Sequence, residues 1–194
     1  MTRAEQVKNK VDELYKVKNP GRADWADWLY GNHVFVVADY AGQLADRFHA
    51  NKELSMAIGM LHDIADAIMK REDAGHEEKS LSMARYILKE SGFIEEEIRV
   101  GVDDAIRLHS CHNNDVPQSL DGKILSTADA LGHLMTDFYS DSVSKMSKRS
   151  AEENRKWVLE KIERDINKKI FFDEVREEAK PYYEKLKIFF SVVE

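Results

Sequence analysis

An apolar segment in the first half of the chain carries a histidine and an aspartate side by side, His62-Asp63. Most of the other residues between Met56 and Asp66 are Ala, Ile, Leu or Met. An ionised carboxylate buried among such side chains is costly unless it is paired, and a bound cation would remove that cost. The chain must therefore fold so that this pair meets a counter-charge, and the pattern indicates a metal site.

Further candidate ligands lie at wide intervals on either side of the pair. They are His33, His76, His109 and Asp129, and their neighbours alternate between apolar and polar at helical spacing. Imidazole and carboxylate suit Mn, Fe, Co, Ni, Zn or Mg, and a set without a thiolate argues against a structural zinc site. The sequence therefore predicts an open, catalytic metal site.

Two of these candidates, His76 and His109, also have a plainer interpretation. His76 is also consistent with a solvated residue in a first helical turn, and His109 with a residue at a helix end, where the dipole favours imidazolium. His112, three residues after His109, is an alternative ligand to it, although its Asn-rich surroundings indicate exposure. Metal binding remains the favoured interpretation of His76 and His109.

The backbone should be almost entirely helical. Only three prolines and nine glycines occur in 194 residues, and the segments between them are rich in Ala, Leu, Ile, Lys and Glu. This length suits one large domain, and we predict an all-α helical bundle. The expected helices span about 3–17, 24–49, 52–71, 76–90, 94–109 and 120–139, followed by a mobile linker at 140–150 and two charged amphipathic helices.

Charge and composition exclude several classes of protein. The net charge of -7 offers no basic surface for a nucleic-acid polymer. No apolar stretch approaches the roughly 20 residues that span a bilayer, and the N-terminus lacks the apolar core of a signal peptide. One cysteine, Cys111, permits no intramolecular disulfide and fits a reducing compartment. We therefore expect a cytoplasmic protein without a membrane partner.

Three stretches together resemble a known family. Residues 32–41 around His33, 60–66 around His62-Asp63 and 123–131 around Asp129 are similar to the motifs of the HD superfamily of metal-dependent phosphohydrolases. The likeness covers about residues 32–134. It implies that His33, His62, Asp63 and Asp129 hold one divalent ion.

Some branches of this superfamily add two histidines and a second ion. His76 and His109 lie where those histidines would be expected, and Asp63 would then bridge the two ions. The resemblance thus implies one or two divalent ions of unknown identity, held by His33, His62, Asp63, His76, His109 and Asp129.

Two departures from other branches bear on the chemistry. Many two-metal members have a lysine three residues after the central aspartate, whereas this chain has Asp66, as nucleotidase-like members have an acidic residue there. On a helix Asp66 would lie one turn from His62 and Asp63, so we expect it to orient or deprotonate the attacking water. The glycine-tyrosine-proline signature of cyclic-dinucleotide phosphodiesterases is missing from the chain, which argues against that substrate. Lys79, one turn after His76, is a candidate contact for a substrate phosphate.

The expected organisation follows from the resemblance. Residues 1–22 would form an N-terminal helix and linker, 23–139 the metal-binding helical domain, and 140–194 additional helices packed on it that either cover the site or form a homodimer face. The expected activity is hydrolysis of a phosphate ester or anhydride of a small molecule, with nucleotides among the candidates and Asp63 and Asp66 as catalytic residues. Two alternatives stay open, a di-iron oxygenase of the same ligand arrangement and a non-catalytic nucleotide-binding regulator.

Overall fold

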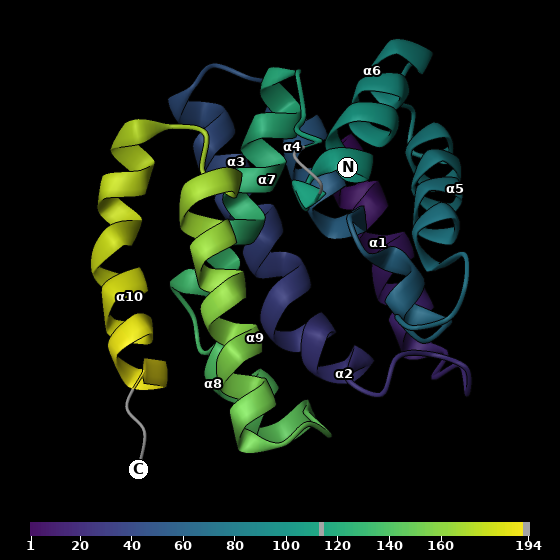
Figure 1. Ribbon diagram of the computed structural model, residues 1–194. Helices are drawn as coiled ribbons and strands as arrows, with labels where there is room; N and C mark the ends of the chain where they lie inside the picture. Colours follow the sequence, from purple (N-terminus) through teal and green to yellow (C-terminus); the bar gives the residue numbers. More distant parts are fainter. Residues whose placement is uncertain (113–114, 192–194) are drawn as a thin grey trace.

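Helix α7 (Leu120–Leu134) lies at the centre of the fold (Figure 1). It is buried around most of its circumference, as expected for a helix with apolar residues on all sides. Helix α3 (Phe35–Arg47) packs along α7, and α4 (Lys52–Leu61) packs on α3. Gly59 permits the close approach of α4 to α3, because a Cβ there would lie 2.8 Å from the Cα of Ala38. These three helices bring the predicted motifs together.

The computed structural model describes residues 1–112 and 115–191, and this part of the chain contains helices and no strand. The predicted all-α fold is therefore confirmed. None of the helices described is both long and apolar enough to cross a bilayer. Asn113 and Asn114 of the predicted loop lie outside the described residues.

The first half of the chain surrounds α4. Helix α1 (Arg3–Lys16) begins with a capping box between Thr2 and Glu5 and packs against α4. A short helix, α2 (Ala26–Leu29), continues through a π-helical turn, η1 (Tyr30–Val34), into α3. On the opposite side from α9 and α10 lie α5 (His76–Glu90), α6 (Glu95–Arg99) and the π-helical η3 (Val100–Ile106) (Figure 1).

The helix predicted over 52–71 ends much earlier, at Leu61. Asp63 adopts φ -128° and ψ 35°, and the chain continues as the 3₁₀ turn η2 (Ile64–Ala67). Contacts with other elements explain the break: the amide of Ala65 donates to the Ser80 hydroxyl, and the carbonyl of Asp66 accepts from the amide of Ala23. His62 and Asp63 consequently stand at the end of a helix and not within one.

The segment predicted to be a mobile linker is largely helical. Residues 140–146 complete α8 (Phe138–Asp141) and form the π-helical η5 (Ser142–Met146), whereas residues 147–150 are not helical. Phe138 is buried in the core, and the indole of Trp28 donates to the Asp141 carboxylate at 2.8 Å. These contacts with distant residues anchor a segment whose serines and lysines by themselves suggested a linker.

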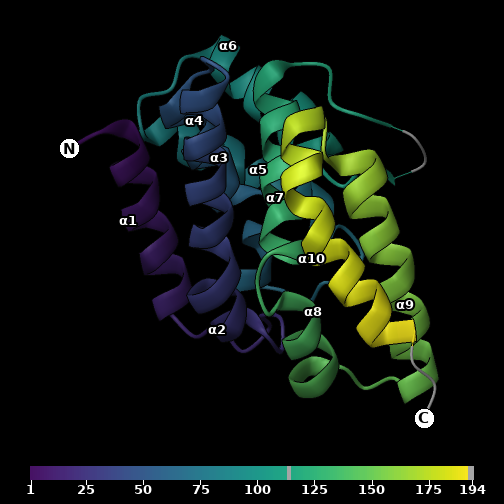
Figure 2. The same cartoon turned by 90° about the vertical axis from the view of Figure 1, so that its left-hand side faces the viewer.

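The C-terminal segment forms α9 (Ala151–Arg164), the π-helical η6 (Asp165–Lys169) and α10 (Asp173–Ser191). Helices α9 and α10 lie side by side (Figures 1 and 2). Where η6 meets α7, the Thr127 hydroxyl donates to the carbonyl of Lys169 and accepts from the amide of Phe171. The division into residues 1–22, 23–139 and 140–194 stays a prediction.

Candidate metal centre

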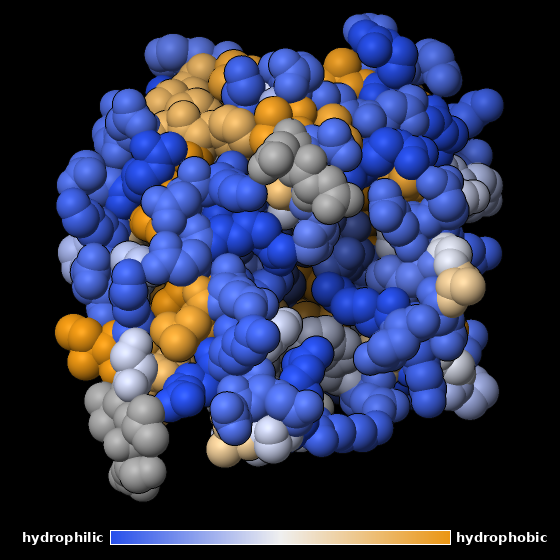
Figure 3. All heavy atoms as spheres, viewed as in Figure 1, coloured by the Kyte–Doolittle hydropathy of each residue, from blue (hydrophilic) through white to orange (hydrophobic). Residues whose placement is uncertain are grey.

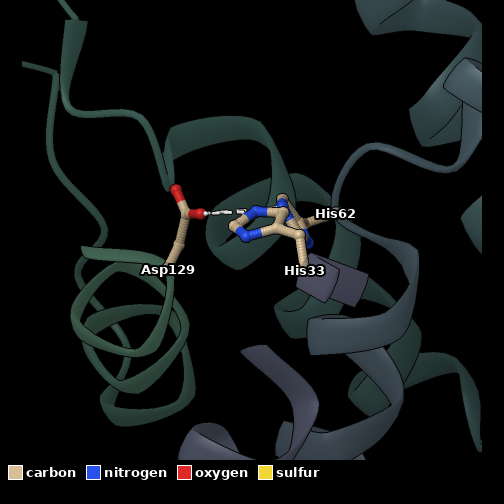
Figure 4. A group of neighbouring side chains, drawn as sticks. All are labelled: His33, His62 and Asp129. Carbon is tan, nitrogen blue, oxygen red and sulfur yellow. Dashed lines mark ion pairs between the residues drawn. The ribbon is translucent and has the colours of Figure 1, made fainter. Parts of the chain in front are cut away.

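Three buried side chains from three elements converge beside the C-terminal half of α7. His33 comes from η1, His62 follows α4, and Asp129 lies in α7 (Figure 4). Nε2 of His33 is 3.2 Å from Oδ1 of Asp129, and Nε2 of His62 is 3.7 Å from the same oxygen. One donor atom from each lies within 4.8 Å of the others, a spacing that could hold a metal ion.

The hydrogen bonds of His62 determine where its lone pair points. Its Nδ1 donates to the carbonyl of Gly59 at 2.8 Å, so the unprotonated nitrogen is Nε2. This Nε2 is buried without a hydrogen-bond partner, as are Nδ1 of His33 and Oδ1 of Asp129. Unpartnered buried polar atoms are rare in folded proteins. Here a lone pair and a carboxylate oxygen face each other, so the site fits a cation.

A second group shares His62 and adds Asp63 and His109. Oδ2 of Asp63 is 3.7 Å from Nε2 of His62. His109 donates from Nδ1 to the carbonyl of Ile106 at 2.6 Å, which leaves its Nε2 as the unprotonated nitrogen. Five of the six predicted ligands therefore fall into two overlapping groups that could each hold an ion.

The sixth predicted ligand, His76, falls in neither group. Its Nε2 lies 2.9 Å from Oδ1 of Asp66, at the start of α5. Asp66 is completely buried, and both of its oxygens are also bound by Arg71. The structure thus places the Asp66 carboxylate against Arg71 and His76, which line the cavity beside this centre, while Asp66 itself is not a lining residue.

Two cations, Arg71 and Lys79, differ in whether they line the cavity beside the metal centre. Arg71 donates to Oδ2 of Asp63 at 2.7 Å and lines the cavity beside the centre. Lys79, the predicted phosphate contact, is exposed and is not among the lining residues. Arg71, which sequence reasoning did not single out, is therefore a cation at the cavity wall, whereas the phosphate contact of Lys79 stays a prediction.

Three further residues of the centre were missed from the sequence. Nε2 of His133 lies 3.3 Å from Oδ1 of Asp129, and its Nδ1 lies 3.1 Å from Oδ2 of Asp165. Lys169 pairs with the other Asp129 oxygen and lies 3.7 Å from Asp165. The spacing of four between Asp129 and His133 places both on one face of α7 and was a usable signal. No motif indicated Asp165 or Lys169.

These neighbours keep Asp129 ionised. Burial by itself raises the pKa of a carboxyl group, but His133 and Lys169 outweigh it and hold the pKa of Asp129 well below its usual range. Lys169 pairs with Oδ2 of Asp129, and the other oxygen, Oδ1, lies near His33 and His62. The carboxylate is thus in the protonation state and orientation that a metal ligand needs.

The centre lies at the wall of a cavity of about 1130 Å³. Hydrophilic side chains surround the recess on the face seen in Figure 3. Among the described residues, nine Lys and Arg line it against seven Asp and Glu, whereas the whole chain has 29 against 36. The cavity is therefore richer in cations than the protein and suits an anionic ligand.

Metal binding should persist into acid. Burial lowers the pKa of His109 to about 4, against about 6.5 for a free imidazole. Protons compete for a ligand only near or below its pKa, so affinity should change little from pH 8 to about 6 and fall as pH drops toward 4. Metal per chain measured after equilibration at each pH tests this. Half-release near pH 6.5 would contradict it.

A family model described as the HD domain matches residues 30–133. The match includes all five residues of the two metal groups and ends at His133, so Asp165 and Lys169 lie beyond it. Neither a search of curated proteins nor a search of solved structures finds a match.

Proposed function

This chain belongs to the HD domain family, because the matching region covers more than half of it, and we propose that it hydrolyses a phosphate ester or anhydride of a small molecule. The family is in general one of metal-dependent phosphohydrolases. Nucleotides are the first candidates for the substrate, which we expect to be a small phosphorylated compound and not a nucleic-acid polymer.

One observation carries the proposal. The buried atoms Nε2 of His62 and Oδ1 of Asp129 face each other without hydrogen-bond partners. They point to a cation at this position, and histidine with carboxylate is a donor set used by catalytic divalent ions. The excess of cations in the cavity supports an anionic substrate beside it.

Each residue of the centre has a defined task in this proposal. His33, His62 and Asp129 would hold one ion, and Asp63 with His109 would extend the set toward a second. A divalent ion there would lower the pKa of a water molecule and offset charge on phosphoryl oxygens. Arg71 orients Asp63 through its 2.7 Å hydrogen bond and presents a positive charge to the cavity.

Asp66 would act through Arg71 and His76. Its two oxygens hold the Arg71 guanidinium, and Oδ1 also meets the ring of His76. Since the carboxylate is completely buried, we propose a positioning role for it in place of the role of general base.

Metal removal tests the proposal directly. Protein treated with a chelator and then dialysed should release no phosphate from a panel of nucleotides, sugar phosphates and inorganic polyphosphates. Reloading with Mn, Co, Ni, Zn or Mg in turn should restore release of orthophosphate from at least one compound. If no compound is turned over with any of these ions bound, the proposal is wrong.

The same preparation separates the two alternatives. Purified protein that carries close to two irons per chain and consumes oxygen would indicate an oxygenase. Tight binding of a nucleotide without turnover under all metal conditions would indicate a regulator. The surplus of cavity cations favours phosphate over dioxygen as the ligand.

A further inference from the structure

Helix α9 turns one face toward the cavity. Trp157, Lys161 and Arg164 line the cavity and are spaced by four and three residues, so they share one side of the helix. All three lie beyond residue 133, where the match to the HD domain ends. A ligand bound by these three residues would therefore be recognised by the C-terminal segment of this chain, outside the region that matches the HD domain.

Lys161 is a cation without a counter-ion. Among the described residues it forms neither an ion pair nor a hydrogen bond, and its contact is with the ring of Trp157, 5.9 Å from Nζ. The nearby carboxylate of Asp165 is already engaged by His133, Tyr139 and Lys169. Burial, with the charges of Lys169 and Arg164, lowers the pKa of Lys161 to about 8 in spite of Asp165.

Arg164 likewise meets no carboxylate among the described residues. Its Nη1 lies 3.1 Å from Nδ1 of His112, and its Nε is buried without a hydrogen-bond partner. Burial and the charges of Arg164 and Lys161 lower the pKa of His112, and an imidazole carries no negative charge in either protonation state, so His112 does not neutralise Arg164. Glu160 of the same helix also lines the cavity, but its side chain is 66% exposed and pairs with Lys156. In the described part of the chain, Lys161 and Arg164 thus stand together without a carboxylate bound to either.

Gathering uncompensated cations in a partly desolvated cavity costs free energy, which a bound anion would offset. Arg and Lys are the side chains that proteins use most for phosphate. Lys169, whose ammonium pairs with Asp129, lies eight residues after Lys161, about two helical turns along α9 and η6. An anion held by Lys161 and Arg164 would therefore lie beside the metal centre and not at it.

We propose that Lys161 and Arg164 form a second phosphate subsite, so that the cavity takes a linear chain of two or more phosphates with one end at the metal centre. The inference rests on the proposed function, because only that function says that one end of the phosphate chain reacts at the metal centre. Either a nucleoside polyphosphate or an inorganic polyphosphate carries such a chain.

The test is calorimetric titration of metal-loaded protein with tripolyphosphate and, separately, with orthophosphate. Wild type should bind tripolyphosphate at least tenfold more tightly than orthophosphate. The double variant Lys161→Gln/Arg164→Gln should lose that preference while its affinity for orthophosphate stays within twofold. Lys156→Gln is the matched control, since Lys156 lies on α9 with its side chain 78% exposed and lines no part of this cavity.

Equal metal concentrations cancel the chelation of metal by tripolyphosphate when variants are compared with wild type, and titration of tripolyphosphate into metal without protein gives the correction for the comparison with orthophosphate. Metal content and melting temperature of the double variant must match wild type. If they do not, the single variants Lys161→Gln and Arg164→Gln replace it. Unchanged tripolyphosphate affinity in the variants, or no preference in wild type, overturns the subsite.

The outcomes for subsite and proposed function are distinguishable. Loss of binding preference in the double variant supports the subsite even if no compound is hydrolysed, whereas hydrolysis with unchanged tripolyphosphate affinity supports the function alone. A nucleoside triphosphate that binds more tightly than tripolyphosphate indicates a nucleoside source for the chain. Equal affinities indicate that the phosphates alone are recognised, and both results support the subsite.

Discussion

Asp63→Asn should lower phosphate release about 1000-fold, which corresponds to ~4 kcal/mol of transition-state stabilisation. The substitution keeps the shape of the side chain but removes the negative charge beside His62 and His109. It also removes one of the two carboxylates that pair with Arg71, which donates to Asp63 at 2.7 Å and also binds Asp66. Both changes weaken the hold on a divalent ion, so metal per chain should fall as well.

The matched control is Asp73→Asn. Asp73 lines the same cavity and is exposed, but it belongs to neither metal group. Its carboxylate accepts from the amide of Lys70, a bond that an asparagine oxygen can also accept. The control should retain activity within about threefold. Wild-type activity and metal content in Asp63→Asn would refute the assignment of Asp63 to the centre.

Lys169→Met should destabilise metal-free protein by about 3–5 kcal/mol, the usual cost of removing one partner of a buried ion pair. Lys169 is 1% exposed, pairs with Asp129 and lies 3.7 Å from Asp165. Methionine has similar length but no charge, so two buried carboxylates lose their shared cation. A divalent ion at Asp129 should restore part of the loss by mass action.

Denaturant unfolding of the variant, with and without added metal, measures both effects. Lys156→Met is the control, because that exposed side chain should change stability by no more than about 0.5 kcal/mol. A metal-free Lys169→Met as stable as wild type would show that the ammonium contributes no net stabilisation. Equal stability of the variant with and without metal would show that no ion reaches Asp129.

Helical periodicity predicted most of the elements correctly, because the apolar spacing within a helix is a local property of the chain. The first helix ends before Asn19-Pro20-Gly21, as those residues indicate. The prediction failed at three places. The helix expected over 120–139 ends at Leu134, and a separate helix begins at Phe138. At the other two places, residues distant in the sequence bind the backbone or a side chain of the segment. Ser80 and Ala23 bind the segment after Leu61, and Trp28 binds the segment at Asp141.

The candidate ligands could be predicted from the sequence because the residue types, His and Asp, and the spacing of the motifs are properties of the sequence itself. His33, His62, Asp63, His109 and Asp129 come together in two groups, although their metal-binding role stays a prediction. Asp66 and His76, which were also predicted to act at the site, belong to neither group. Asp66 lies in the 3₁₀ turn after α4 and its carboxylate contacts the ring of His76, a contact that a helix predicted over 52–71 did not indicate.

By itself, then, the sequence determined the all-α class, the family and the ligand types, since helix periodicity and short motifs are local. Only the tertiary structure decided the charge state of the centre and the character of the cavity. Lys169 reaches Asp129 across 40 residues, and Lys161 and Arg164 reach the cavity because η6 and α10 pack on α7. Such contacts depend on how whole helices pack, and no local pattern encodes them.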